Sequence, residues 1–128
     1  MPATGLGIAL KMLRERRTLS QRELGELSEV DNAYISRLEV GEKVNPTPET
    51  ITKLLRVLKA TERDASILKW LAVHPITSPD LVKYTLDTPD VLYDYFVSAA
   101  GMSFRGDARP TPEALLARVK RMYEEDEE

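Results

Sequence analysis

The chain has 128 residues, enough for one domain or for a small domain with an extension. A hydrophobic content of 42% and a charged content of 30% are ordinary for a soluble globular protein, and we expect it in the cytoplasm. No apolar run reaches the roughly 18 residues of a membrane helix, and no charged-then-apolar leader opens the chain. Cysteine is absent and His74 is the only histidine, so we expect no disulfide, no His/Cys metal site and no cofactor.

The net charge of −3 is unevenly distributed along the chain. Residues 1–72 hold twelve Lys/Arg and ten Asp/Glu, whereas residues 73–128 hold six Lys/Arg and eleven Asp/Glu. The negative total argues against coating nucleic acid by bulk charge. The asymmetry favours one surface for phosphate and another for a protein, although the acidic run 124–128 alone could be a solvated tail.

Helix-start signals recur along the chain. A hydroxyl residue, a proline and an acid follow one another four times; the hydroxyl can cap a helix, the proline fits its first turn and the acid favours its N-terminus. These four are Thr47-Pro48-Glu49, Ser78-Pro79-Asp80, Thr88-Pro89-Asp90 and Thr111-Pro112-Glu113. A fifth start, Ser20 to Glu23, has the spacing of a capping box. No alternating run predicts a strand, so the fold class is predicted to be all-α.

Five helices are predicted in the first part of the chain, over about residues 5–17, 21–28, 32–40, from 48 onward and 62–72. Gly41 is the expected end of the third. Trp70 is expected to fill the junction with the second part rather than to bind a ligand. The side chains predicted to face the core are Leu6, Ala9, Leu10, Leu13, Leu24, Leu27, Ile35, Leu38, Ile51, Leu54, Leu55, Leu58, Ala65, Leu68 and Leu71.

The pattern changes after His74-Pro75. Three further helices are predicted, with apolar faces formed by Leu81, Val82 and Leu86; by Val91, Leu92, Tyr95 and Phe96; and by Leu115, Leu116, Val119 and Met122. Six of the seven Tyr and Phe residues follow residue 80, which suits a second core or an interface. We divide the chain into 1–73, a five-helix domain, and 74–128, a helical region for dimerisation or regulation. The non-periodic stretch 101–109 is either an interhelix loop or an exposed cleavage or switch segment.

The segment from Gln21 to Val40 has the features of a helix-turn-helix, whose second helix enters the major groove of DNA. Gly25 permits the close crossing of the two helices, and polar residues open the second one. The segments Leu19–Gly25 (LSQRELG) and Tyr34–Glu39 (YISRLE), followed by Gly41 and Pro46, resemble the Xre/Cro family of helix-turn-helix regulators, which includes phage repressors. The resemblance covers about residues 6–60 and implies a repressor-like DNA-binding domain.

The resemblance also implies roles for individual residues. Gln21 matches the position that fixes a DNA phosphate, and the base-reading positions are Asn32, Ala33, Ser36 and Arg37. Arg and Asn side chains can bond guanine and adenine in a bidentate fashion, and helix N-termini attract phosphate, so the chemistry agrees. Tyr34 is expected on phosphate or sugar, Lys43 in the loop that follows the DNA backbone, and Arg22 either on DNA or on a solvated face.

The resemblance to this family also gives an interpretation of the Arg14–Glu39 pair and of Glu29. Arg14 and Glu39 match a structural ion pair beneath the motif, so Arg14 is expected to support the fold rather than to touch DNA. Glu29 stands where the family usually has glycine in a left-handed turn. A glutamate there costs on the order of 1 kcal/mol and adds negative charge near the groove, beside Glu26 and Asp31.

Two functions follow. The first is a homodimeric repressor that binds double-stranded DNA at a near-palindromic operator, with the C-terminal region supplying the dimer. The second is an antitoxin-like or protease-regulated repressor, whose acidic C-terminal region binds a partner such as a toxin or a regulatory protease. An enzyme is not expected, because the chain lacks a Gly-rich phosphate loop and a nucleophile elbow. Asp87, Asp90 and Asp94 are interpreted as surface charge rather than catalytic carboxylates.

Overall fold

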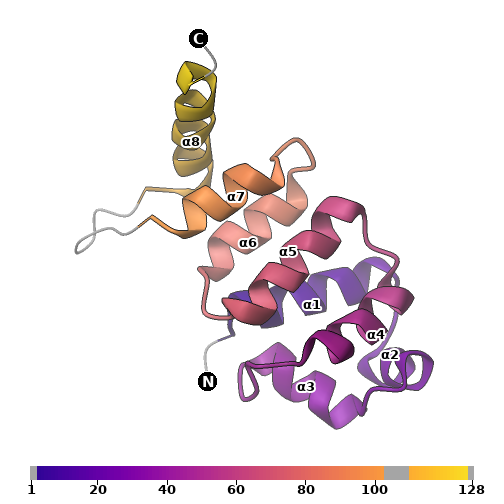
Figure 1. The fold of residues 1–128 in the computed structure, drawn as a ribbon. Helices are drawn as coiled ribbons and strands as arrows, with labels where there is room; N and C mark the ends of the chain where they lie inside the picture. Colours follow the sequence, from indigo (N-terminus) through magenta and orange to yellow (C-terminus); the bar gives the residue numbers. More distant parts are fainter. Residues whose placement is uncertain (1–2, 103–109, 127–128) are drawn as a thin grey trace.

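The computed structural model describes residues 3–102 and 110–126, and these residues contain eight helices and no strand (Figure 1). The all-α fold class is therefore confirmed. The first five helices are α1 (Gly5–Arg16), α2 (Gln21–Ser28), α3 (Asn32–Val40), α4 (Pro48–Leu58) and α5 (Glu62–Val73). The remaining three are α6 (Pro79–Asp87), α7 (Tyr93–Ala100) and α8 (Pro112–Asp126).

Helix α1 lies at the centre of the arrangement. It packs against α3, α5 and α6, and it buries Leu6, Ala9, Leu10 and Leu13. Helices α2 and α3 lie at one end of the molecule, α6 and α7 stack beyond α5, and α8 projects from the other end (Figure 1). Because α6 packs directly on α1, Leu81, Val82 and Leu86 belong to the same core cluster as the first five helices.

Helix starts follow the capping residues in the sequence, with one exception. The side-chain oxygens of Thr47, Ser78 and Thr111 each accept a hydrogen bond from a backbone amide of the following turn. Thr88 does not start a helix, which corrects our prediction. The carbonyl oxygens of Thr88 and Val91 both accept hydrogen bonds, each of 2.8 Å, from the Arg63 guanidinium, and the chain turns there. Helix α7 begins later, at Tyr93, without a side-chain cap.

The predicted core is largely observed, but three of its leucine and methionine positions are wrong because the side chains are exposed. Leu27 is 57% exposed and Met122 is 47% exposed. Leu27 falls at the edge of the face that α2 buries with Leu24 and Ser28, so no neighbouring helix covers it. Met122 falls at the edge of the face of α8 that packs on the other helices, whereas the next residue, Tyr123, still contacts Tyr95 and Ser98 of α7. Leu92, also predicted to face a core, is 55% exposed because it precedes α7.

Besides the packing of α6 on α1, further side-chain contacts join the first five helices to the rest. Trp70 packs edge-on against Phe96 of α7, with ring centroids 5.4 Å apart, so it occupies the junction as predicted. On the other side, buried Asp64 of α5 accepts hydrogen bonds from both Arg16 and Arg63. Arg16 also donates to the carbonyl oxygen of Leu86 at the end of α6. Among the helices in the described part of the chain, none is both long and apolar enough to cross a membrane.

Candidate functional site

Helices α2 and α3 and the turn between them form the candidate site. Ser20 accepts a hydrogen bond from the Glu23 amide and Glu23 accepts one from the Ser20 amide, both at 3.0 Å, which completes the predicted capping box. The hydrogen bond that the Ser20 amide donates to the Glu23 carboxylate holds the pKa of Glu23 below its usual range. Glu29 then turns the chain with φ 62° and ψ 29°, and Asp31 caps α3 by accepting from the Ala33 amide at 2.9 Å. The left-handed turn predicted at Glu29 is therefore present.

Two glycines allow the helices to approach closely. A Cβ atom on Gly25 would lie 2.8 Å from the Val30 carbonyl oxygen, so only glycine fits where α2 meets the start of α3. A Cβ atom on Gly7 would lie 2.5 Å from the Glu39 carbonyl oxygen, where α1 crosses the end of α3. Gly25 was identified from the sequence, whereas Gly7 was missed because its neighbour lies more than thirty residues away. Together these contacts fix α3 relative to α1 and α2.

An ion pair beneath α3 fixes it further. Nε and Nη2 of Arg14 donate to the two carboxylate oxygens of Glu39, each at 2.8 Å, and both residues are buried. The hydrogen bonds to Glu39 raise the pKa of Arg14. Arg14 also donates to the Leu19 carbonyl oxygen, so it ties the loop before α2 to α3. Arg14 thus has the structural place that the resemblance implied.

The predicted phosphate-contacting residue Gln21 is linked to the same pair. Its side-chain amide donates to Glu39 at 3.0 Å, and the residue is half-buried at the first position of α2. This contact orients the Gln21 side chain beside the N-terminus of α2, whose backbone amides favour an anion. The link to Glu39 joins residues eighteen positions apart and was not foreseen.

The four predicted base-reading residues lie along one side of α3. Ile35 and Leu38 of α3 point into the core and are fully buried, which leaves the opposite side of the helix free. Helical spacing puts the four predicted residues on that side, where three are exposed and one is half-buried: Asn32, Ala33, Arg37 and Ser36. Within the described residues Arg37 forms no ion pair. Its guanidinium therefore remains available to a ligand.

Sequence reasoning missed Val40 on the same side of α3. Val40 follows Ser36 and Arg37 by four and three residues, and it is 45% exposed at the last position of the helix. An apolar side chain on a groove-facing surface can contact a thymine methyl group. The sequence alone does not identify Val40 as exposed, because this requires knowing which side of α3 faces the core.

The other predicted contacts flank this surface. Tyr34 is half-buried on α3, and Lys43 is exposed in the connection after it. The Lys43 amide donates to the Arg37 carbonyl oxygen at 3.2 Å, which holds that connection against the end of α3. Arg22 is exposed and lies 3.4 Å from Glu26 on the same helix, a surface pair of small energetic value.

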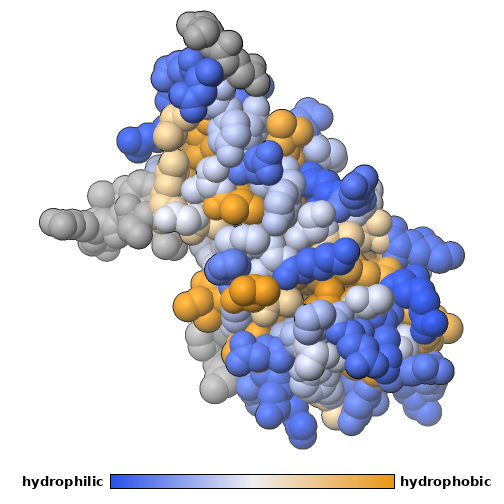
Figure 2. All heavy atoms as spheres, viewed as in Figure 1, coloured by the Kyte–Doolittle hydropathy of each residue, from blue (hydrophilic) through white to orange (hydrophobic). Residues whose placement is uncertain are grey.

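Acidic residues border the start of α3. Glu26, Glu29 and Asp31 line an open hollow of about 430 Å³ together with Arg22 and Asn32. Three carboxylates against one guanidinium make this edge repel a phosphate backbone. Figure 2 shows that the surface over α2 and α3 is mostly hydrophilic. The candidate site is therefore a polar surface on which Arg37 and Lys43 lie toward the end of α3, while Arg22 lies among the carboxylates near its start.

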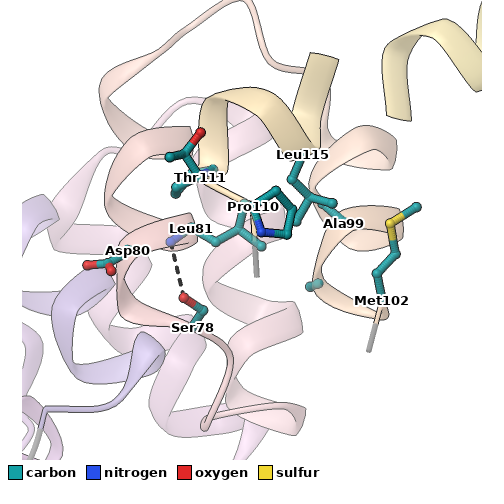
Figure 3. Close-up of a pocket in the computed structure, with 10 residues that line it drawn as sticks. Ser78, Asp80, Leu81, Ala99, Met102, Pro110, Thr111 and Leu115 are labelled. Carbon is teal, nitrogen blue, oxygen red and sulfur yellow. Dashed lines mark hydrogen bonds between the residues drawn. The ribbon is translucent and has the colours of Figure 1, made fainter. Parts of the chain in front are cut away.

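A second hollow, of about 300 Å³, lies in the C-terminal part between the starts of α6 and α8 and the end of α7 (Figure 3). Its two hydroxyls serve helix caps, since Ser78 accepts from the Leu81 amide and Thr111 accepts from the Ala114 amide, and its one carboxylate, Asp80, lies in the first turn of α6. We therefore assign it no chemistry. The predicted cleavage or switch segment 101–109 falls mainly outside the residues that the structure describes.

Comparison with known proteins agrees with this geometry. Residues 6–66 match the family model of the helix-turn-helix domain. The chain is 45% identical over 53 residues to the HTH-type transcriptional repressor RghR of Bacillus subtilis (strain 168), a match covering 41% of this chain and 39% of that protein. It is 30% identical over 93 residues to the uncharacterized HTH-type transcriptional regulator RghRB of the same organism, covering 73% and 65%. The matches thus span less than two thirds of either relative, and no solved structure is significantly similar to the chain.

Proposed function

We propose that this chain is a DNA-binding transcription regulator that acts as a homodimeric repressor on a near-palindromic operator. The observation that carries the proposal is the exposed polar side of α3, held rigidly by the Arg14–Glu39 pair and by the close approach at Gly25. The helix-turn-helix match over residues 6–66 and the names of the two relatives support it. The narrower assignment to the Xre/Cro group rests on the motif residues alone.

Base reading is assigned to the residues on the exposed side of α3. Arg37 has the donors to bond guanine O6 and N7, and Asn32 can bond adenine N6 and N7. Ala33 and Ser36 lie between them and would contact bases at the floor of the groove. Each good bidentate contact discriminates against the wrong base by about 1–3 kcal/mol.

Contacts to the DNA backbone are assigned to the residues at the rim. Gln21 and the amides at the start of α2 would bind one phosphate, and Lys43 a second. Tyr34 would reach phosphate or sugar, and Arg22 would leave its weak pair with Glu26 to do the same. The nearby carboxylates of Glu26, Glu29 and Asp31 lower the affinity for DNA in general, so specific contacts have to provide more of the binding energy.

The homodimer is proposed because one such module buries too little surface to be specific alone. Two copies related by a two-fold axis would place their α3 helices in half-sites about 34 Å apart. We assign dimerisation to residues 74–128, where six of the seven Tyr and Phe residues occur after residue 80. As a DNA-binding protein without a membrane-spanning helix among the described residues, it is proposed to act in the cytoplasm.

Footprinting of the promoter region next to the gene tests the proposal. Arg37→Ala should lower the affinity for the protected site by about 1–3 kcal/mol, because a bidentate base contact is lost. Lys83→Ala is the matched control, since Lys83 is exposed on α6, outside the site. Equal protection by wild type, Arg37→Ala and Lys83→Ala would refute the role of α3, and the absence of any protected site would refute the proposed function.

A further inference from the structure

A cationic hollow lies beside the site and has no part in DNA recognition as assigned above. Its volume is about 310 Å³, and the ends of α1, α2 and α4 surround it. The lining contains three basic and three apolar residues and no carboxylate: Arg17, Leu19, Leu27, Arg56, Val57 and Lys59. All three basic residues are exposed, and so is Leu27, with 57% of its surface accessible.

The partial negative charges at helix C-termini neutralise only part of the positive charge of this hollow. Arg17 and Lys59 are the C-cap residues of α1 and α4, and Arg56 donates to the Leu27 carbonyl oxygen near the end of α2 at 3.5 Å. Each helix C-terminus carries about half a negative charge, so three formal cations exceed what the three helix ends can neutralise. None of the three cations is in an ion pair within the described ranges. The hollow therefore has a net positive potential around an uncovered leucine.

The chain carries a segment with the opposite character. At the end of α8, Met122 is 47% exposed, whereas Tyr123 packs on α7 of its own copy, with its ring centroid 4.9 Å from that of Tyr95 and its hydroxyl 3.0 Å from Ser98 Oγ. Glu124, Glu125 and Asp126 follow, all exposed, and the sequence continues with two more glutamates. An exposed methionine close to an acidic run is complementary to a leucine and valine surface bordered by three cations.

The two complementary features cannot meet within one copy of this fold. Helix α8 projects from α6 and α7, and its C-terminal end points away from α2 and α4, which lie at the opposite end of the molecule (Figure 1). If a two-fold axis places the α8 end of one copy in the hollow of the other, the same axis places the second α8 end in the first copy's hollow. Such a reciprocal contact is made twice and closes the dimer without forming a filament.

We propose that the acidic end of α8 docks in the cationic hollow of a second copy of this chain. Met122 covers Leu27, and the carboxylates at the end of α8 pair with Arg17, Arg56 and Lys59. The inference rests on the homodimer of the proposed function, and it pairs the end of the assigned dimerisation region, residues 74–128, with a surface on the first five helices. It also explains why Leu27 and Met122, both expected in the core, are exposed in a single copy.

A charge exchange between the two surfaces tests the docking. One variant carries Arg56→Glu and Lys59→Glu, and the other carries Glu124→Lys and Glu125→Lys. Because like charges then face each other, each variant alone should self-associate about tenfold more weakly in sedimentation experiments at low salt. An equal mixture of the two should regain wild-type affinity, since the heterodimer restores opposite charges at both contacts. Lys69→Glu with Lys83→Glu is the control for net charge, because both lysines are exposed outside the hollow.

Each other outcome overturns the docking. Unchanged self-association in both variants, or no recovery on mixing, shows that the two surfaces do not meet. Loss of DNA affinity in the Arg56→Glu and Lys59→Glu variant, with self-association intact, shows that DNA phosphate occupies the hollow instead. A wild-type chain that stays monomeric refutes the homodimer as well, whereas the role of α3 is decided separately by the Arg37→Ala footprint.

Cross-linking provides a second measurement that does not depend on charge. The chain has no cysteine, so single cysteines can be introduced without background. A short bismaleimide should join chains carrying Arg56→Cys to chains carrying Glu125→Cys when the two are mixed. Replacing the first partner by Lys83→Cys should abolish the product, and equal product from that control would overturn the proposed contact.

Discussion

At the scale of single residues, Glu29 has the least favourable backbone in the site. Its φ of 62° is left-handed, and it shares this region with Thr18 and Lys59 among the described non-glycine residues. A side chain there costs on the order of 1 kcal/mol compared with glycine. The Glu29 carboxylate also borders the start of α3, together with Glu26 and Asp31. Backbone strain and unfavourable charge therefore coincide at one position.

Glu29→Gly should raise stability by about 0.5–1 kcal/mol, because relief of the left-handed strain outweighs the added freedom of the unfolded chain. It should also tighten DNA binding, because one negative charge leaves the edge of the groove. Thermal unfolding and a DNA titration measure the two effects. Glu29→Gln separates them: it should tighten binding with an unchanged melting temperature. If Glu29→Gly had the same melting temperature as the wild type, the backbone strain assigned to Glu29 would be contradicted.

Gln21 illustrates what sequence reasoning can and cannot supply for the site. Its place at the start of α2 follows from the local capping box, which the sequence spells out. Its bond to Glu39 depends on how α1 and α3 pack, and no local spacing contains that information. The same holds for Val40, whose outward position depends on which side of α3 is buried. Residue types and motif positions were predictable, whereas the partners that orient them were not.

At the scale of helices, local chemistry decides most starts and a long-range contact overrides one of them. Thr88-Pro89-Asp90 has the same form as three sequences that do begin helices. The guanidinium of Arg63, twenty-five residues earlier, donates a hydrogen bond to the Thr88 carbonyl oxygen, and the chain turns there instead of starting a helix. Arg63 is itself held by buried Asp64, which also binds Arg16. This cluster of Arg16, Arg63 and Asp64 fixes the end of α6 against α1 and α5.

Asp64→Asn should destabilise the protein by about 2 kcal/mol, because two guanidinium groups lose a shared carboxylate while one of them stays mostly buried. The midpoint of urea unfolding measures the loss. Asp87→Asn is the matched control, since Asp87 is largely exposed and lies 3.7 Å from the same Arg16. Its effect should be about 0.5 kcal/mol or less. Equal losses in the two variants would mean that burial of Asp64 adds nothing to the pair.

At the scale of the whole molecule, a change in sequence pattern predicted the division into residues 1–73 and 74–128. The sequence pattern did not predict that one hydrophobic core contains residues from both parts. Helices and their inward faces are set by local spacing, and for α1 to α6 they were largely predicted. The packing of α6 on α1 joins segments about seventy residues apart. Nothing in the local spacing of Leu81, Val82 and Leu86 says which earlier helix they meet. The structure thus connects the two parts through a shared core rather than through a linker.

A shared core predicts that the full chain unfolds in one step. Trp70, the only tryptophan, lies at the junction beside Phe96, so its fluorescence should change at the same temperature as the helical circular dichroism. A chain that ends at residue 75 should melt lower by about 10 °C or more, because burial of each large apolar side chain of α6 contributes about 1.5–3 kcal/mol. Two separated transitions in the full chain, or a truncated chain as stable as the whole, would instead show that residues 1–73 fold independently. In that case the contact of α6 with α1 would position the C-terminal region without stabilising the DNA-binding helices.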